Sequence, residues 1–220
     1  MRDERLHEIV LNYLNIKKKK PLRLSRWKNF LKNLHSSNNI LNVAIIGKYV
    51  SLHDAYKSIS ESLIHAGANL NSTVNIKWIP SEDLKNKNIK SKLKNIDGVI
   101  VAPGFGERGI EGKISAIKYV RENNIPFFGI CLGMQCACIE FSRNVLGEKN
   151  GNSTEFNKNT TYPIIDLMEE QKNIKNKGGT MRLGSYKCTL EKGSLIYKTY
   201  KSSDINERHR HRYEFNNLYK

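Results

Sequence analysis

Cys131 is the residue whose surroundings in the sequence most clearly indicate chemistry. It lies in the segment Gly129-Ile130-Cys131-Leu132-Gly133, where an apolar run gives way to a helical pattern. A nucleophile flanked by glycines at such a junction has the form of a nucleophile elbow, because side chains at either glycine would collide across the turn. The start of the helix favours the thiolate, and the backbone N–H of Leu132 would help to stabilise an oxyanion. A buried structural cysteine is the alternative interpretation.

A second segment, Pro103-Gly104-Phe105-Gly106, also follows an apolar run. Glycines at this position allow backbone N–H groups to approach a ligand closely. Pro103 has no N–H to donate, so a backbone donor must come from Gly104 or a later residue. A plain turn between a strand and a helix is the alternative.

The elements that must position these two segments follow from the hydrophobic pattern. Strands are expected over 41–47, 73–79, 97–102 and 125–130, and helices over 54–66, 110–123 and 132–144. This alternation predicts an α/β fold, with an open, mostly parallel sheet and helices on both faces. Ligands of such sheets bind outside the carboxyl ends of the strands, where residues 104–109 and 129–133 are expected to lie.

The ends of the chain are less regular. Helices are expected over 4–15 and from Ser25 to about Leu34, with Ser25 as the cap, so residues 1–40 are interpreted as a tail and a basic linker before a domain over 41–220. Beyond residue 145 the pattern weakens. The segment 150–159 is polar, 163–168 is mildly apolar, 173–179 has the composition of a loop, and 185–190 is a candidate strand.

The composition bounds the classes of protein that the chain can belong to. Its formal charge is +16, but the excess rests on 26 Lys with 25 Asn and 23 Ile, residues that an AT-rich genome over-supplies. We therefore expect a solvated basic linker and no nucleic-acid partner, although a nucleic-acid-binding module would show a similar charge. No apolar run approaches the length of a membrane helix, and the polar N-terminus does not resemble a signal peptide.

The four cysteines do not have the spacing of a metal site. We expect no metal, and free thiols in a reducing cytoplasm.

Several segments carry a resemblance to a known family. Residues 129–135 (GICLGMQ) are similar to the active-cysteine motif of class I glutamine amidotransferases. Further motifs resemble the amidotransferase domain of the CTP synthases and occur in the same order. They are 47–59 (GKYVSLHDAYKSI), 103–114 (PGFGERGIEGKI), 152–156 (NSTEF), 178–184 (GGTMRLG) and 207–217 (ERHRHRYEFNN). The resemblance runs from about residue 40 to the end, and the N-terminal tail is similar to the segment that joins this domain to the synthase domain.

The resemblance implies a glutamine site. Cys131 would attack the side-chain amide of L-glutamine, and Glu155 and Arg212 would hold the amino and carboxylate ends of the substrate. The remaining residues that match the family's glutamine-binding backbone are Gly104, Leu132, Gly133, Met134 and Gln135. Pro103 departs from the family, in which that position is more often glycine.

The resemblance also implies a function for the whole enzyme. The domain would supply ammonia for the ATP-dependent amination of UTP to CTP, with ATP, Mg²⁺ and UTP bound by a synthase (amidoligase) domain that this chain lacks. No cofactor is expected in this chain, and members of the family form homo-oligomers. The expected location is the cytoplasm.

One family motif has no match in the sequence. The His-x-Glu pair that activates the cysteine is not found, and His209 and His211 belong to a different motif, for which structural or substrate-supporting roles are expected. We therefore expect an amidotransferase domain truncated at the C-terminus, which hydrolyses glutamine at least about 100-fold more slowly than an intact homologue. The alternative is a catalytically impaired remnant, or an assembly or binding protein of the same fold.

Overall fold

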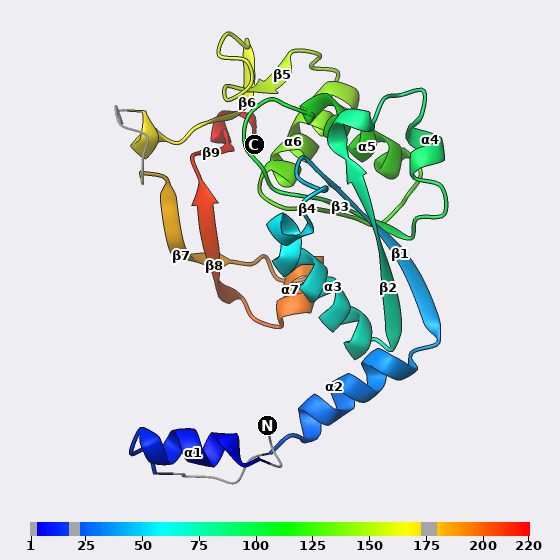
Figure 1. Ribbon diagram of the computed structural model, residues 1–220. Helices are drawn as coiled ribbons and strands as arrows, with labels where there is room; N and C mark the ends of the chain where they lie inside the picture. The colour runs from blue at the N-terminus through cyan, green and yellow to red at the C-terminus, as the bar shows by residue number, and fades with distance from the viewer. Residues whose placement is uncertain (1–3, 18–22, 173–179) are drawn as a thin grey trace. The chain divides into compact units, whose positions relative to one another are not determined.

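The computed structural model describes residues 4–17, 23–172 and 180–220 (Figure 1). The chain divides into two compact units. One, the N-terminal unit, comprises residues 1–40 and 61–73, and the other, the main unit, comprises 41–60 and 74–220. The two units do not divide at residue 40 alone, because residues 61–73 also belong to the N-terminal unit. The domain boundary expected at residue 40 therefore stays a prediction.

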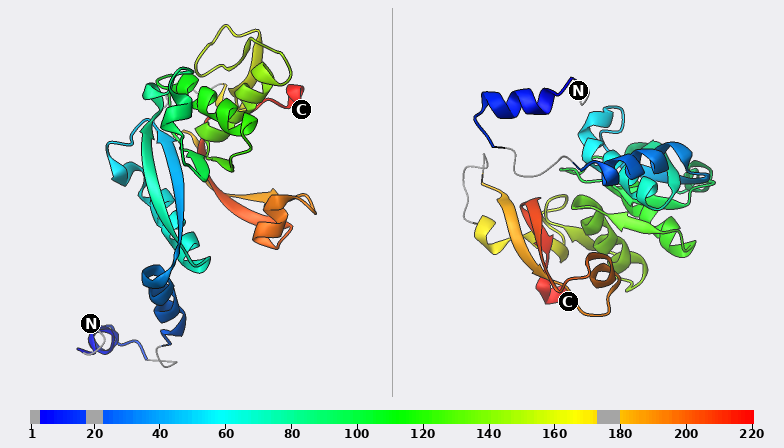
Figure 2. Two further views of the ribbon diagram at one scale, coloured as in Figure 1. Left: turned by 90° about the vertical axis from the view of Figure 1, so that its right-hand side faces the viewer. Right: turned by 90° about the horizontal axis from the view of Figure 1, so that it is seen from below.

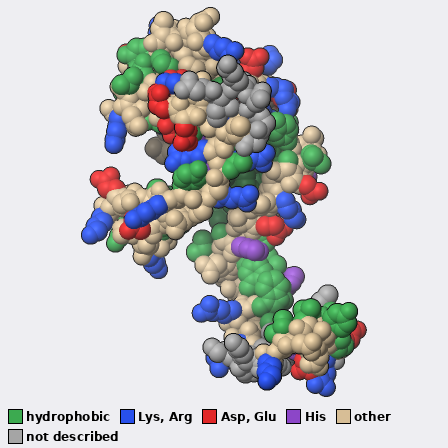
Figure 3. All heavy atoms as spheres, turned by 90° about the vertical axis from the view of Figure 1, so that its left-hand side faces the viewer, with side chains coloured by type: hydrophobic (Ala, Val, Ile, Leu, Met, Phe, Trp, Pro, Cys, Tyr) green, Lys and Arg blue, Asp and Glu red, His purple; other side chains and the backbone are tan. Residues whose placement is uncertain are grey.

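The N-terminal unit contains α1 (Leu6–Tyr13) and α2 (Ser25–Ser36). Ser25 is the first residue of α2 and Leu24 occupies the cap position without a side-chain hydrogen bond, so the prediction of a serine cap is wrong. Within this unit Trp27 stacks on Phe30, with 5.3 Å between ring centroids. Apolar side chains of both helices are exposed on the surface, as Figure 3 shows. The basic linker expected within residues 1–40 includes four consecutive lysines over 17–20, of which only Lys17 lies among the described residues.

The main sheet has the strand order β2-β1-β3-β4. Its strands are β1 (Asn39–Gly47), β2 (Ser72–Pro80), β3 (Gly98–Val101) and β4 (Phe127–Gly129). The strands β1, β3 and β4 are parallel, and their register places Ile46 beside Val101, and Val101 beside Gly129. The carboxyl ends of these three neighbouring strands therefore lie along the same side of the sheet. The glycine-containing segments 104–109 and 129–133 follow β3 and β4 on that side.

Helices connect the strands of this sheet. The helix α3 (Lys57–Asn69) is preceded by a 3-10 turn over His53–Tyr56, whereas the sequence pattern predicts one continuous helix from residue 54. The helices α5 (Ile110–Glu122) and α6 (Leu132–Asn144) pack against each other and against β3 and β4 (Figure 1). A short helix α4 (Ile89–Lys92) and a 3-10 turn over Ser81–Asp83 pack on α5. The parallel sheet flanked by helices confirms the predicted α/β class.

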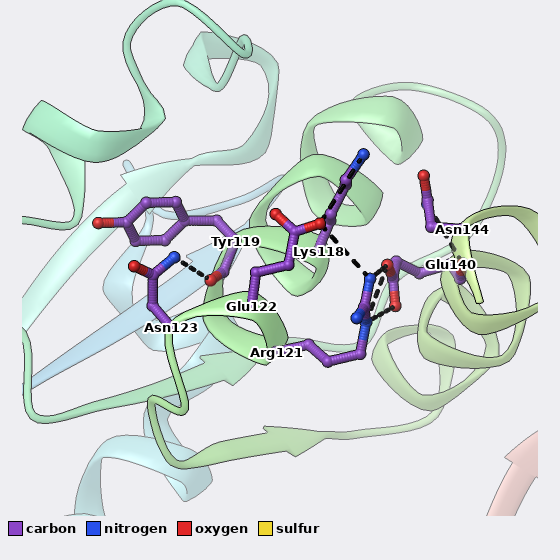
Figure 4. A network of polar contacts seen from close by, with 7 residues as sticks. All are labelled: Lys118, Tyr119, Arg121, Glu122, Asn123, Glu140 and Asn144. Atoms are coloured by element: carbon purple, nitrogen blue, oxygen red, sulfur yellow. Dashed lines mark hydrogen bonds and ion pairs between the residues drawn. The ribbon is translucent and has the colours of Figure 1, made fainter.

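A buried ion pair joins α5 to α6. Arg121 donates to both carboxylate oxygens of Glu140, with Nη2 at 2.8 Å from Oε1 and Nε at 3.0 Å from Oε2. Figure 4 shows the guanidinium facing this carboxylate, with Glu122 beside it. The side chain of Glu140 is 1% exposed and that of Arg121 is 35% exposed, so the acid is removed from water and depends on its partner.

The second half of the main unit contains two smaller sheets. One has the order β5-β6-β9, with β5 (Gly151–Ser153) parallel to β6 (Tyr162–Leu167) and β9 (Tyr213–Phe215) antiparallel to β6. The other is an antiparallel ribbon of β7 (Arg182–Thr189) and β8 (Asp204–His211), separate from the main sheet (Figure 2). The remaining short elements are α7 (Leu195–Tyr200) and 3-10 turns over Glu169–Gln171 and Asn217–Tyr219.

The sequence pattern predicts this second half only in part. The strand expected over 185–190 corresponds to most of β7, and the apolar segment 163–168 corresponds to β6. The strands β8 and β9 were not predicted. In β8 the more buried positions alternate as a strand requires, but they carry Glu207, His209 and His211, so no hydrophobic alternation marks it. The loop expected over 173–179 lies outside the described residues.

Candidate active site

Cys131 lies at a sharp turn between β4 and α6. The strand ends at Gly129, the helix begins at Leu132, and Cys131 between them has φ 53° and ψ −108°, a conformation that side chains rarely adopt. A Cβ at Gly129 would lie 2.7 Å from the backbone carbon of Gly133. A Cβ at Gly133 would lie 2.1 Å from the carbonyl oxygen of Val101. Both glycines are therefore required by close approach of backbone, and the elbow expected from the sequence is present.

The environment of the Cys131 sulfur acts on its pKa in opposite directions. Burial raises the pKa of the thiol, and the negative charge of Glu155 acts in the same direction. A hydrogen bond from the Leu132 N–H and the positive charge of Lys113 lower the pKa by a smaller amount. The Leu132 N–H at the start of the helix favours the thiolate, as expected from the sequence. Burial has the larger effect, so the net pKa of Cys131 is raised.

Cys131 opens onto a cleft of about 260 Å³ at the carboxyl edge of the parallel strands. The residues that line it are Gly104, Phe105, Cys131, Gln135, Glu155, Lys158, Met181, His211, Arg212 and Tyr213. Five of the eight candidate site residues therefore meet in one cleft, although they come from segments as distant as 104 and 212. Leu132 and Gly133 lie buried beneath the elbow, and Met134 lines an adjoining cavity.

The two charged candidates are held by hydrogen bonds to neighbouring segments of the chain. Glu155 accepts a hydrogen bond from the Gly106 N–H at 2.7 Å, which ties it to the loop after β3. Arg212 is 8% exposed, and its Nη1 donates to the side-chain oxygen of Gln171 at 2.6 Å and to the Thr180 hydroxyl at 3.3 Å. Its guanidinium is therefore fixed in place while it remains at the wall of the cleft.

The adjoining cavity is larger, about 920 Å³, and it also reaches Cys131. The inward face of β8 contributes His209 and His211 to its wall, with 4.8 Å between the two ring centroids. Burial lowers the pKa of His211, and the positive charges of His209 and Arg182 act in the same direction. Among the described residues, no hydrogen bond joins a histidine to the Cys131 sulfur.

Comparison with known proteins places this geometry in a family. The model of the glutamine amidotransferase class-I family matches residues 51–220. The chain belongs to the class-I glutamine amidotransferases. Within that family it corresponds to the amidotransferase domain of CTP synthases, as the following matches show.

A CTP synthase of Cytophaga hutchinsonii is 58% identical over 219 residues, which cover 100% of this chain and 41% of the relative. A CTP synthase of Flavobacterium johnsoniae is 54% identical with the same coverage. The structure described as the glutaminase domain of Trypanosoma brucei CTPS with bound acivicin is 41% identical, with a TM-score of 0.74, and the match covers 81% of this chain and 69% of that chain. The chain thus spans about 41% of the length of the curated CTP synthases that it matches.

Three buried polar side chains beside the cleft of this amidotransferase domain were not predicted from the sequence. They are Lys48, Tyr56 and Lys113, which are 6%, 3% and 0% exposed. One signal was available for Lys113, because a lysine there shares a helix face with the apolar Ile110, Ile114 and Ile117. Lys48 directly follows a buried strand, which is also unusual for a charge.

Two further properties concern metals and membranes. In the described part of the chain, no three His, Cys, Asp or Glu side chains gather as potential metal ligands. No helix among the described residues is long and apolar enough to cross a membrane.

Proposed function

We propose that this chain is a glutaminase domain that binds L-glutamine in the 260 Å³ cleft and releases its amide nitrogen as ammonia. The observation that carries the proposal is the meeting of Cys131, Glu155 and Arg212 in that one cleft, with the sulfur on a nucleophile elbow. A thiol, an acid and a guanidinium are the groups needed to attack an amide while an α-ammonium and an α-carboxylate are held.

The substrate would be oriented by its two charged ends. Glu155 would pair with the α-ammonium, and the planar guanidinium of Arg212 suits the α-carboxylate. Because both side chains are already anchored, by the Gly106 N–H and by Gln171 and Thr180, little further ordering is needed when glutamine binds. The side-chain amide of glutamine would then face Cys131.

The reaction has two steps. The Cys131 sulfur attacks the amide carbon, a C–S bond forms and the C–N bond breaks, and the nitrogen takes up a proton and leaves as ammonia. Water then attacks the thioester, which gives glutamate and restores the thiol. The Leu132 N–H, with a backbone N–H from the segment at Gly104, would stabilise the oxyanion in both steps, while Gly133, Met134 and Gln135 complete the substrate site.

The ammonia would serve the amination of UTP to CTP. The proposal follows from the named relatives, of which this chain spans 41%. ATP, its Mg²⁺ and UTP would bind to the amidoligase part of the enzyme, which would also be the partner of this domain in a homo-oligomer. No residue of this chain is assigned to those ligands. A cytoplasmic location belongs to the same proposal, and the four cysteines are free.

Turnover by this chain alone is expected to be slow. Burial raises the pKa of Cys131, and among the described residues no histidine is hydrogen-bonded to its sulfur. General acid–base assistance typically contributes about 10²–10⁴-fold. Labelling of the thiol is therefore a more direct test of the site than the rate of ammonia release alone.

The experiment measures both quantities. The protein is treated with acivicin, the compound named with the Trypanosoma brucei structure, and the adduct is located by peptide mass spectrometry with and without L-glutamine. We expect a single adduct on Cys131, slowed by L-glutamine but not by D-glutamine, and none in Cys131→Ala. Labelling that ignores L-glutamine or falls on Cys138 or Cys188 would contradict the proposal.

Ammonia release then separates the glutaminase from a protein of the same fold that binds without turnover. The expected rate is low but dependent on Cys131. If turnover is instead close to that of an intact homologue and is lost in His211→Asn, His211 is the missing base, since it lines the cleft beside Cys131.

A further inference from the structure

We infer that Lys48, Tyr56 and Lys113 are positioning residues of the glutamine cleft, which hold the segment 102–106 by its carbonyl oxygens. The inference rests on the proposed function, because it concerns the same cleft. Gly104 and Phe105 of this segment line the cleft.

Lys113 holds the first residue of the segment. Its side chain is 0% exposed, and its Nζ donates a hydrogen bond to the carbonyl oxygen of Ala102 at 2.7 Å. A fully buried ammonium is costly and is retained only where it satisfies polar groups. Ala102 is also bonded to β1, through its N–H and the carbonyl oxygen of Ile46 at 2.9 Å. The segment therefore leaves the sheet from a fixed point.

Tyr56 holds the second residue. Its hydroxyl donates to the carbonyl oxygen of Pro103 at 3.4 Å and accepts from the N–H groups of Lys48 and Tyr49 at 3.1 and 3.3 Å. One oxygen atom thus connects the loop after β1 with the loop after β3. The ring packs so closely on Gly47 that a Cβ there would lie 2.6 Å from the hydroxyl oxygen, so the placement of Tyr56 depends on that glycine.

Lys48 holds the last two residues. Its Nζ donates to the carbonyl oxygen of Phe105 at 2.6 Å and to that of Gly106. The Gly106 N–H in turn donates to Glu155, so this residue is bonded at its oxygen by a cation and at its N–H by the candidate ammonium-binding acid. Lys48 therefore helps to position Glu155 through the backbone of Gly106, which bonds to both side chains.

Together these bonds account for the carbonyl oxygens of Ala102, Pro103, Phe105 and Gly106. A loop held by its carbonyl groups on the protein side keeps its shape while the cleft is empty, and such preorganisation favours binding of the substrate. Loss of one of these bonds should therefore weaken the recognition of glutamine more than it changes the intrinsic reactivity of the Cys131 sulfur.

The test compares Tyr56→Phe and Lys48→Met with the wild type. Tyr56→Phe removes one hydroxyl and keeps the ring against Gly47. Tyr119→Phe, a change at a partly buried tyrosine of α5 that packs on the core, is the matched control. Three quantities are measured: the L-glutamine concentration that halves acivicin labelling of Cys131, the rate of its alkylation by iodoacetamide, and the melting temperature.

For Tyr56→Phe we expect the protecting glutamine concentration to rise roughly 3- to 10-fold, and for Lys48→Met roughly 10-fold or more, because its bonds involve a charged donor. The iodoacetamide rate should stay within about twofold of the wild type, since this small reagent does not use the glutamine-binding groups. Tyr119→Phe should leave both quantities unchanged.

Two results would overturn the inference. One is unchanged glutamine protection in Tyr56→Phe. The other is an equal loss of glutamine protection and iodoacetamide reactivity together with a lower melting temperature, which is the result of a merely structural role. If the wild type itself shows no glutamine-protected labelling, the proposed function fails first and the inference falls with it.

Discussion

The Cys131 sulfur is more buried than a reactive thiol usually is, and this determines its response to pH. Burial raises its pKa, so the thiolate fraction at neutral pH is lower than that of a free thiol, and it increases only as the pH rises toward the raised pKa. We expect the iodoacetamide rate at Cys131 to keep rising above about pH 9.5, where the rate of an unstructured cysteine peptide, with a thiol pKa near 8.5, levels off. Cys136, whose pKa burial raises to about 12, should remain unlabelled in the folded protein. A plateau for Cys131 below pH 8 would show that its thiolate is instead stabilised.

Gly133 is the residue at which the elbow tolerates least change. A Cβ there would lie 2.1 Å from the Val101 carbonyl oxygen, so Gly133→Ala must displace α6 from β3. We expect a loss of about 1–3 kcal/mol in the free energy of unfolding, with slower acivicin labelling of Cys131. Gly98→Ala on β3 is the matched control, because its Cβ would meet no atom closer than 3.7 Å. Denaturant unfolding with equal losses for the two variants would count against the close approach.

At the scale of residues, the sequence predicted those groups whose chemistry has a local pattern. The glycines around Cys131 are required by backbone contacts within a few residues, so their spacing carries the signal. Glu155 and Arg212 were found only through the resemblance to a family, and their meeting with Cys131 is a consequence of tertiary structure. Tyr56 was not found, because its role depends on a hydrogen bond to a residue 47 positions away.

The buried carboxylate of Glu140 contributes to the contact between α5 and α6. Arg121→Met would leave Glu140 buried at 1% exposure without its guanidinium. Breaking a buried pair by removing one partner costs about 3–5 kcal/mol, and because Arg121 is itself 35% exposed we expect about 2 kcal/mol. Glu122→Gln is the control, since its contacts with Lys118 at 4.0 Å and with Arg121 at 3.8 Å are both at the surface and should contribute less than about 1 kcal/mol. Thermal unfolding of both variants measures the difference, and equal melting temperatures would contradict this role for the pair.

At the scale of elements, the sequence was most informative where packing imposes a period. The helix expected over 132–144 has these bounds in the structure, and the helix expected over 110–123 ends one residue earlier. Both bury one face against the sheet, so their hydrophobic pattern is strong. The ribbon strand β8 lacked this signal, because its inward positions carry Glu207, His209 and His211 in place of apolar residues.

The stability of the whole molecule should reflect the buried charge of Lys113. Burial lowers the pKa of this lysine to about 8, below its usual value in an unfolded chain. Between about pH 8 and pH 10.5 the unfolded state therefore binds more protons at this residue than the folded state, and its contribution to stability increases with pH. We expect Lys113→Met to be at least as stable as the wild type at pH 7.

That advantage should shrink by up to about 3 kcal/mol as the pH rises to 10. The two proteins are compared in a Cys136→Ala background, because the raised pKa of Cys136 acts in the opposite direction and itself depends on the charge of Lys113. A stability difference that does not change from pH 7 to pH 10 would show that Lys113 is not desolvated.

The central claim is that one cleft holds both ends of glutamine against the Cys131 sulfur, and a crystal structure of the acivicin adduct tests it most directly. We predict a covalent bond to the Cys131 Sγ, with the amino group of the ligand within hydrogen-bond distance of Glu155 and its carboxylate within hydrogen-bond distance of Arg212. An adduct on Cys131 whose charged ends contact neither side chain would contradict the account, as would an adduct on any other cysteine.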